Sequence, residues 1–299
     1  MDKTLRGAAE MSAAMTILGT IGLFVILSGQ GAIDVVFWRC AFGALALLVI
    51  CASQGLLRRQ LTLKKLGLAV LGGIAIVVNW AMLFSAYSEA SIGVATAVYN
   101  TQPFILVGFG VLFLGERVTM GKLSWLGVAF VGVLLIIQAK PESADYANAN
   151  YAVGIGLALA AAFFWAVAAL LTKKLTGTPP QLIALIQVCV GILMLAPFVS
   201  WNALPSGSTA WGALFTLGVV HTGIMYILMY GAVQKLPTYL QGAFSFIYPV
   251  VAIFVDYAAF GHQLQPLQLL GAGAIILAAM GMTFGWRLVG VKATASTSQ

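Results

Sequence analysis

The feature that most constrains this 299-residue chain is a series of long apolar runs that follow one another from end to end. Most are close to the roughly 20 residues that let an α-helix cross a hydrocarbon core of about 30 Å. They are continuously apolar, whereas barrel strands alternate polar and apolar residues. The sequence therefore predicts an all-α integral membrane protein with ten transmembrane helices. The expected spans are 10–28, 33–53, 66–87, 92–114, 122–139, 152–174, 180–201, 210–233, 238–260 and 266–286.

The composition excludes a soluble protein. Hydrophobic residues make up 61% of the chain and charged residues only 8%, too few to cover the surface of a water-soluble domain of this length. The segments between the runs, such as SGQGAID and QKLPT, are short and leave no room for a separate soluble domain. We therefore expect the lipid bilayer to surround nearly the whole chain.

The net charge of +7 indicates an orientation in the membrane. If the N-terminus is cytoplasmic, ten spans return the C-terminus to the same side, and most lysines and arginines between spans fall there, as the positive-inside rule requires. We expect a multi-pass protein of the cell inner membrane, with both termini cytoplasmic and no nucleic-acid partner. The cytoplasmic set is Lys3, Arg6, Arg58, Arg59, Lys64, Lys65, Arg117, Lys122, Lys173, Lys174, Lys235, Arg287 and Lys292, and Lys140 is the exception.

The second half of the chain repeats features of the first. An offset of 146 residues aligns Pro103 with Pro249, and an offset of 148 aligns Arg39 with Gln187. The matches keep their order across half the chain. Further pairs are Ala86 with Ala232, Ala97 with Ala243, Gly115 with Gly261, Gly127 with Gly273, Gly43 with Gly191 and Leu45 with Leu193.

These offsets predict two five-helix repeats, residues 8–139 and 150–287, followed by a disordered cytoplasmic tail at 288–299. Because five is odd, the repeats must insert in opposite orientations. Inverted repeats are the architecture of many secondary transporters, which alternate access about a site near the bilayer midplane. We therefore predict two inverted repeats around a central cavity.

Three tracts carry a resemblance to a known family. ASIGVATAVYNTQPFILVGFGVLFLGERVTMGKLSWLGVAFVGVLLI has a proline before a GE helix end and then a glycine-rich helix; the others are VVFWRCAFGALALL and AAFFWAVAALLTKKL. In these the chain resembles the drug/metabolite transporter superfamily, specifically its ten-helix EamA-type exporters with two repeated units. Its aromatic richness is similar to that of the branch exporting aromatic amino acids and flat aromatic cations such as methyl viologen.

Polar side chains at membrane depth must find a partner or line a wet cavity, so they are the candidates for a substrate site. The third, fourth, eighth and ninth runs supply most of them and form two pairs related by the repeat. The predicted cavity residues are Asn79, Trp80, Tyr99, Gln102, Trp165, Gln187, His221, Tyr226, Ser245 and Tyr248.

Two prolines stand beside these polar residues. Pro103 and Pro249 are expected to kink the fourth and ninth helices, since proline removes a backbone hydrogen bond and crowds the carbonyl one turn back. The polar residues beside them then face the substrate path. The alternative is that these polar groups only hold neighbouring helices together.

The rings of Trp80, Tyr226 and Trp165 could stack on a flat ligand or hold a cation, at about 0.5–2 kcal/mol for each contact. A single ring of this kind can equally be a packing residue or an interfacial anchor. His221 could be a proton site or a ligand contact, or a buried neutral residue satisfied by a neighbouring helix.

Arg39 is the sole basic residue in the interior of a predicted span, since Lys122, Lys173 and Lys174 lie at span ends. It lies near the outer end of the second run, where it could pair with Asp34 or receive a substrate carboxylate. The sequence leaves both roles open.

We expect a secondary transporter that exports small, amphipathic, aromatic metabolites by alternating access, with the driving force left open. A nucleotide-sugar or organic-phosphate carrier is the alternative, but it needs several cationic groups in its cavity. An enzyme would need paired acids, a catalytic set or metal ligands at membrane depth, and the runs contain too few of these. Cys40, Cys51 and Cys189 lie in apolar runs without a CxxC motif, so we expect no metal and no cofactor. We expect a monomer.

Overall fold

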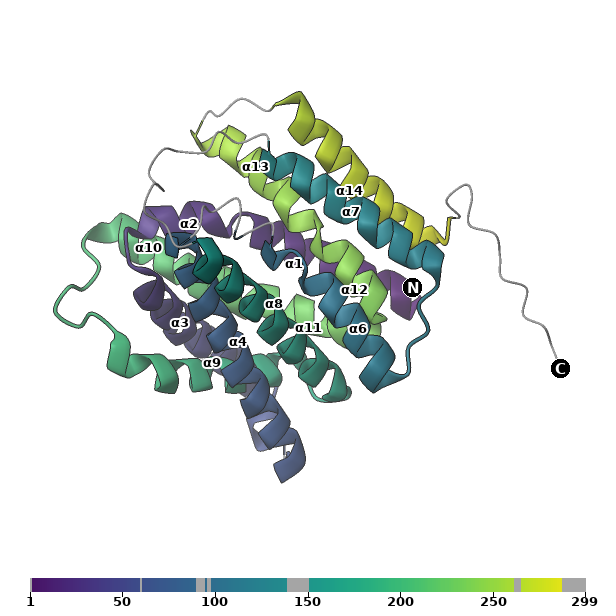
Figure 1. The fold of residues 1–299 in the computed structure, drawn as a ribbon. Coiled ribbons are helices and arrows are strands. Elements are labelled where there is room, and N and C mark those ends of the chain that lie inside the picture. Colours follow the sequence, from purple (N-terminus) through teal and green to yellow (C-terminus); the bar gives the residue numbers. More distant parts are fainter. Residues whose placement is uncertain are drawn as a thin grey trace.

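The chain folds into a bundle of α-helices, shown as a ribbon in Figure 1. In this computed structural model the described residues are 2–59, 61–89, 95, 98–138, 151–260 and 265–286, and no strand occurs among them. Within this part of the chain, eight helical segments are long and apolar enough to cross a membrane. Two further apolar helical segments, Gln102–Leu114 and Met120–Ile136, are shorter than these eight.

Each of the ten predicted runs contains a helix. The N-terminal half has α1 (Lys3–Gly19), α2 (Ile21–Ser28), α3 (Ala32–Ser53), α4 (Leu63–Glu89), α6 (Gln102–Leu114) and α7 (Met120–Gln138), with a 3-10 turn at Leu56–Arg58. The C-terminal half has α8 (Tyr151–Lys174), α9 (Pro180–Leu195), α10 (Gly207–Gly218), α11 (Met225–Lys235), α12 (Thr238–Ser245), α13 (Ile247–Phe260) and α14 (Pro266–Phe284). A 3-10 turn, Ala196–Phe198, follows α9, and a π-helical segment, Val219–Ile224, joins α10 to α11.

Several helix ends follow from local sequence. Gly29, Gly115 and Gly285 end α2, α6 and α14 in the left-handed conformation, with φ of 60°, 66° and 68°, which glycine adopts without steric cost. At its start, α14 has Pro266 in the first turn and a capping box between Gln265 and Gln268.

The outside of the bundle is apolar. Leu45, Leu112 and Leu193 are 66%, 75% and 78% exposed, and many other large apolar side chains are also exposed. A water-soluble protein rarely exposes so much contiguous apolar surface. With the long apolar helices, this exterior makes the chain a multi-pass membrane protein.

Helices from the two halves pack against each other in antiparallel fashion. Along α3, Asp34, Cys40 and Gln54 meet positions that fall in number, namely Ser200, Gly191 and Gln181. Figure 1 shows α7 and α14 side by side at one edge of the bundle.

The same opposite order occurs in two further helix pairs. Trp125 and Gly132 of α7 meet Gly281 and Gly271 of α14. Gly110 of α6 meets Thr238 of α12, and Pro103 meets Gly242. In all three antiparallel pairs, the partners come from runs that are five positions apart in the chain.

Pro103 and Pro249, the residues expected to kink the fourth and ninth helices, each lie in the first turn of a new helical segment. Pro103 is in the first turn of α6, after a turn at Asn100 and Thr101. Pro249 is the third residue of α13, after α12 ends at Ser245. A helix tolerates proline in its first turn, where the missing N–H has no intrahelical acceptor. The fourth and ninth runs are therefore interrupted just before their prolines.

Glycines on α7 offer a test of the helix packing. A Cβ built on Gly132 would lie 2.7 Å from the carbonyl oxygen of Gly271, whereas one on Gly127 would meet nothing within 4 Å. We expect Gly132→Ala to lower the free energy of unfolding by about 1–3 kcal/mol through overpacking. The control, Gly127→Ala, should leave it unchanged or raise it slightly, because alanine is the better helix former.

Thermal unfolding of both variants in detergent checks this prediction. Equal unfolding temperatures for the two variants would contradict the close contact between α7 and α14.

Candidate substrate site

A row of buried aromatic rings begins at Arg39 of α3. The guanidinium carbon of Arg39 lies 4.3 Å from the ring centroid of Trp80 on α4. The Trp80 ring meets Tyr226 of α11 edge-on at 5.9 Å, and Tyr226 meets Tyr230 edge-on at 5.1 Å. The Tyr230 hydroxyl then donates a hydrogen bond to Oε1 of Gln187 on α9. We call these five residues the arginine–aromatic row.

The row combines four helices, and all five of its members are buried. Trp80 and Tyr226 come from the third and eighth runs, which are among those expected to supply most of the cavity residues, and Gln187, also a predicted cavity residue, comes from the seventh. Edge-to-face geometry between rings is favourable because the ring edge is positive and the face negative. The row therefore has a cationic end at Arg39 and a neutral polar end at Gln187.

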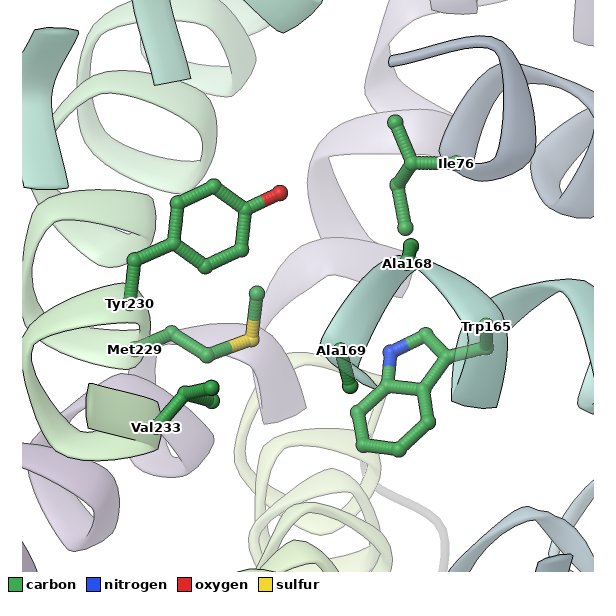
Figure 2. A pocket seen from close by; sticks show the side chains of 7 residues that line it. All are labelled: Ile76, Trp165, Ala168, Ala169, Met229, Tyr230 and Val233. Carbon is green, nitrogen blue, oxygen red and sulfur yellow. The ribbon is translucent and has the colours of Figure 1, made fainter. Parts of the chain in front are cut away.

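A small enclosed space lies beside the neutral end of the row, as Figure 2 shows. Tyr230 and Met229 of α11 face Trp165 of α8 across it, and Ile76 of α4 closes one side. Its volume is about 10 Å³, which is room for about one water molecule. Trp165 is buried, as expected of a cavity residue. A larger hollow of about 360 Å³ lies on the outer face of α3 and α9 and has an apolar lining.

A second polar group joins α4 to its neighbours. The Asn79 side-chain amide donates hydrogen bonds to the Tyr99 hydroxyl at 3.2 Å and to the Ala161 carbonyl oxygen at 2.8 Å. The Tyr248 hydroxyl donates to Oδ1 of Asn100 at 3.4 Å. Gln102 is 3% exposed, and its Oε1 lacks a hydrogen-bond partner in the described part of the chain.

Two of the predicted cavity residues, His221 and Ser245, form hydrogen bonds outside the arginine–aromatic row. His221 is buried in the π-helical segment, with Nε2 2.8 Å from the Thr20 hydroxyl and Nδ1 3.3 Å from the Thr216 carbonyl oxygen. The Ser245 hydroxyl donates to the Gly242 carbonyl oxygen of its own helix. π-helical turns are frequent at functional sites, yet both contacts of His221 are those of a histidine satisfied by neighbouring backbone and hydroxyl groups.

Tyr230 is not among the predicted cavity residues, although it joins both the row and the enclosed space. A signal for it exists in the sequence. Tyr226 and Tyr230 are four residues apart, and residues with this spacing share one face of a helix. Thr222, whose hydroxyl accepts a hydrogen bond from Nε of Arg39, has no such signal in the sequence, because its position depends on the π-helical turn.

Arg39 does not pair with Asp34. Oδ1 of Asp34 accepts the backbone N–H of Ser200 at 2.8 Å, whereas Nε of Arg39 donates to the Thr222 hydroxyl at 3.1 Å. Of the two roles that the sequence leaves open for Arg39, structural pairing with this acid is therefore wrong.

Charged groups tie the halves together at one end of the bundle. Glu116, in the loop between α6 and α7, bonds Nζ of Lys173 at 2.6 Å and accepts the N–H and hydroxyl of Thr238 at 2.8 and 2.7 Å. Glu10 of α1 pairs with Lys235 of α11. A carboxylate at the first N–H groups of α12 is also favoured by the helix dipole.

Burial opposes ionisation of the Glu116 carboxyl group. The hydrogen bonds from Lys173 and Thr238 favour the ionised form and outweigh burial, so the pKa of Glu116 lies below its ordinary value of 4.5. This residue is therefore an anion near neutral pH, and its cluster links the α6–α7 loop to α8 and α12.

A helical bundle with an apolar exterior and a buried polar and aromatic row between its halves is the form of a membrane transporter. Comparison of the sequence with known families agrees. The pattern of the family described as "EamA-like transporter family" matches residues 6–138 and again residues 152–284. The chain belongs to this family, and its expected place in the drug/metabolite transporter superfamily is confirmed.

Individual relatives match over most of their length. The chain is 28% identical to "Uncharacterized transporter YxxF" of Bacillus subtilis, over 92% of this chain and 88% of that protein. It is 26% identical to "Probable amino-acid metabolite efflux pump" of Salmonella typhimurium, over 78% and 82%. It is also 26% identical to "Probable terminal-alkyne amino-acid exporter" of Streptantibioticus cattleyicolor, over 91% and 90%.

A solved crystal structure has the same fold. It superposes with a TM-score of 0.81 over 94% of this chain and 96% of that one, at 19% sequence identity.

The charged end offers a pH test. The Glu116 carboxyl group has a lower pKa in the folded protein than its ordinary value of 4.5 in the unfolded chain. Its ionised form therefore stabilises the folded state fully above pH 4.5, and this stabilisation is lost as the pH falls through the pKa of the folded state. Glu116→Gln should lower the free energy of unfolding by about 1–3 kcal/mol at pH 7. The loss should shrink steadily below pH 4.5.

Unfolding of the purified protein in detergent, followed over a pH series, measures this difference. Glu89→Gln is the control, since Glu89 forms no ion pair in the described structure. A difference of the same size at acidic and neutral pH would refute the role of the ionised Glu116.

Proposed function

We propose that this transporter exports small, amphipathic, aromatic metabolites, namely aromatic amino acids and flat aromatic cations, across the cell inner membrane by alternating access. The observation that carries the proposal is the buried run of Trp80, Tyr226 and Tyr230, which leads to the space beside Trp165. Such rings offer faces and edges to a flat ligand. Relatives whose names specify amino acids or amino-acid metabolites support the amino-acid part.

The proposed mechanism uses ten transmembrane helices in two inverted repeats, residues 8–139 and 150–287, around a central cavity. Two findings support it: the family pattern occurs twice, and helices five runs apart pack antiparallel. Inversion lets the two halves exchange conformations and so open the site to either side in turn. Positive-inside counting supports cytoplasmic termini. The tail at 288–299, proposed to be disordered, lies outside the described residues.

The small size of the enclosed space supports a moving transporter over a static pore. A drug-sized ligand needs a pocket of roughly 300–1,000 Å³, whereas the space beside Trp165 has about 10 Å³. Helices must therefore separate before a substrate can enter. The cluster at Glu116 and the pair of Glu10 with Lys235 hold one end closed in this conformation.

A carrier of nucleotide sugars or organic phosphates is less well supported. Phosphate recognition favours several cationic groups around one site. Among the described residues of the arginine–aromatic row, Arg39 is the one cation. We further propose that the chain acts as a monomer, without a nucleic-acid partner and without a cofactor.

Uptake into liposomes containing the purified protein tests the proposal. The panel holds tryptophan, tyrosine, methyl viologen and a sugar phosphate, each with and without an imposed pH gradient. We expect protein-dependent transport of aromatic compounds. Transport of the phosphate with none of the aromatic compounds would overturn the proposal.

Two substitutions test the proposed aromatic site. Trp165→Ala and Tyr99→Ala should each lower tryptophan flux by about threefold to tenfold, the loss expected from one ring contact. Trp286→Ala is the matched control, because Trp286 is 42% exposed and lies at the end of α14. Flux at the wild-type level in both site variants, with equal amounts of folded protein, would exclude this site.

A further inference from the structure

Arg39 is a buried cation for which the described residues supply no ion-pair partner. It is 2% exposed between α3, α4 and the π-helical segment, where Nε donates to the Thr222 hydroxyl and the guanidinium lies against Trp80. Within the described structure, its two terminal nitrogens have no hydrogen-bond acceptor. The ion pairs that the structure describes belong to Arg6, Lys173 and Lys235.

An unpaired charge is among the most costly groups to bury in a membrane protein, and such residues usually serve ligand binding or transport. The usual compensation is a carboxylate, which matches the two parallel N–H donors of a guanidinium. Asp34 lies on the same helix, but its Oδ1 accepts the N–H of Ser200. The described residues thus leave the terminal donors of Arg39 available to an anion.

Thr222 fixes the direction of these donors. Its hydroxyl donates to the Leu217 carbonyl oxygen at 2.9 Å and accepts from Nε of Arg39 at 3.1 Å, so its one proton is already committed. Because Nε is held from that side and the Trp80 ring covers one face, the terminal nitrogens are the part of Arg39 left for a ligand.

The surroundings of Arg39 also indicate the rest of the ligand. The rings of Trp80, Tyr226 and Tyr230 lead away from the guanidinium toward Gln187, whose Nε2 lacks a hydrogen-bond partner in the described structure. A ligand with its acid group at Arg39 would have its ring among these side chains. No described side chain of this row carries the negative charge that would select an ammonium group.

We propose that Arg39 binds the carboxylate of the transported molecule, so that the substrates are aromatic carboxylic acids for which an α-amino group is not required. This inference rests on the proposed function and narrows it. Aromatic amino acids remain substrates because of their carboxylate. Of the two substrate classes proposed above, the inference gives up the flat aromatic cations, because a like charge at Arg39 repels them inside a medium of low dielectric constant.

Three compounds with the same indole ring test the inference. Tryptophan carries a carboxylate and an amine, indole-3-propionate only the carboxylate, and tryptamine only the amine. Uptake into liposomes with the wild-type protein is measured for each, and liposomes without protein correct for passive leak. We expect transport of both acids at similar rates and of tryptamine at least tenfold more slowly.

Substitution of Arg39 should change the preference and not only the rate. Arg39→Gln should lower the flux ratio of tryptophan to tryptamine at least tenfold, and Arg39→Lys should restore part of it, since lysine keeps the charge without the planar fork. Arg59→Gln is the matched control, because Arg59 is exposed and donates to the Gly177 carbonyl oxygen. A ratio is insensitive to loss of folded protein.

Each outcome decides one of the two proposals. Tryptamine transported by the wild type as fast as tryptophan, or an unchanged ratio in Arg39→Gln, would overturn the role of Arg39 while leaving an aromatic exporter. Failure to transport indole-3-propionate beside normal tryptophan flux would overturn the claim that the amine is not required. If none of the three compounds crosses, the proposed function itself is wrong. Should Arg39→Gln not fold, Arg39→Lys and the wild-type ratio still decide the question.

Discussion

Close approach of antiparallel helices holds the two halves of this protein together. In a bilayer, apolar side chains gain little by leaving lipid for protein, so helix association depends on van der Waals contact and on small residues that let backbones meet. Gly132 and Gly271 bring α7 and α14 together in this way, and Gly191 lets α9 meet Cys40 of α3. The position of every buried polar group between the halves follows from these contacts.

The polar interior is therefore organised by packing and not by ion pairs. Asn79 reaches the Ala161 carbonyl oxygen only because α4 and α8 lie against each other. Gln187 accepts a hydrogen bond from the Tyr230 hydroxyl because α9 and α11 also pack against each other. The described ion pairs lie at one end of the bundle, at Glu10 and Glu116, where water can reach the charges. This division suits a transporter, because helices in the interior can separate without losing a described buried ion pair.

The sequence predicts the helices well and the site only partly. Apolar length alone locates a helix in every expected run, because a membrane span must satisfy its own backbone. It could not locate the break at Thr20 or the π-helical turn before Met225, since both depend on contacts with other helices. Trp80, Tyr226 and Gln187 were predictable as polar or aromatic residues at membrane depth.

The sequence could not predict which polar residues share one row, because this depends on how each helix is rotated about its axis. Helices that are apolar on all sides have little hydrophobic periodicity from which that rotation could be predicted. Ser245 illustrates the limit. Its hydroxyl was as good a candidate as that of Tyr230, but it bonds its own helix at Gly242. Asp34 illustrates a second limit. Its partner is the backbone N–H of Ser200, and a pattern of side chains in the sequence does not reveal a backbone partner.

The two halves match the same family pattern but differ in charge at one equivalent position, and that difference gives the proposed site its direction. Gly43 of α3 packs against Gly218, and its repeat equivalent Gly191 packs against Cys40 and Val77, so both halves use a glycine for the same kind of helix crossing. At the neighbouring equivalent position one half has Arg39 and the other Gln187. In the inverted pair of repeats that we propose, matching residues approach the centre from opposite sides, so this replacement would put the positive charge on one side only. A ligand with one acidic end would therefore have one favourable orientation throughout the proposed exchange of conformations.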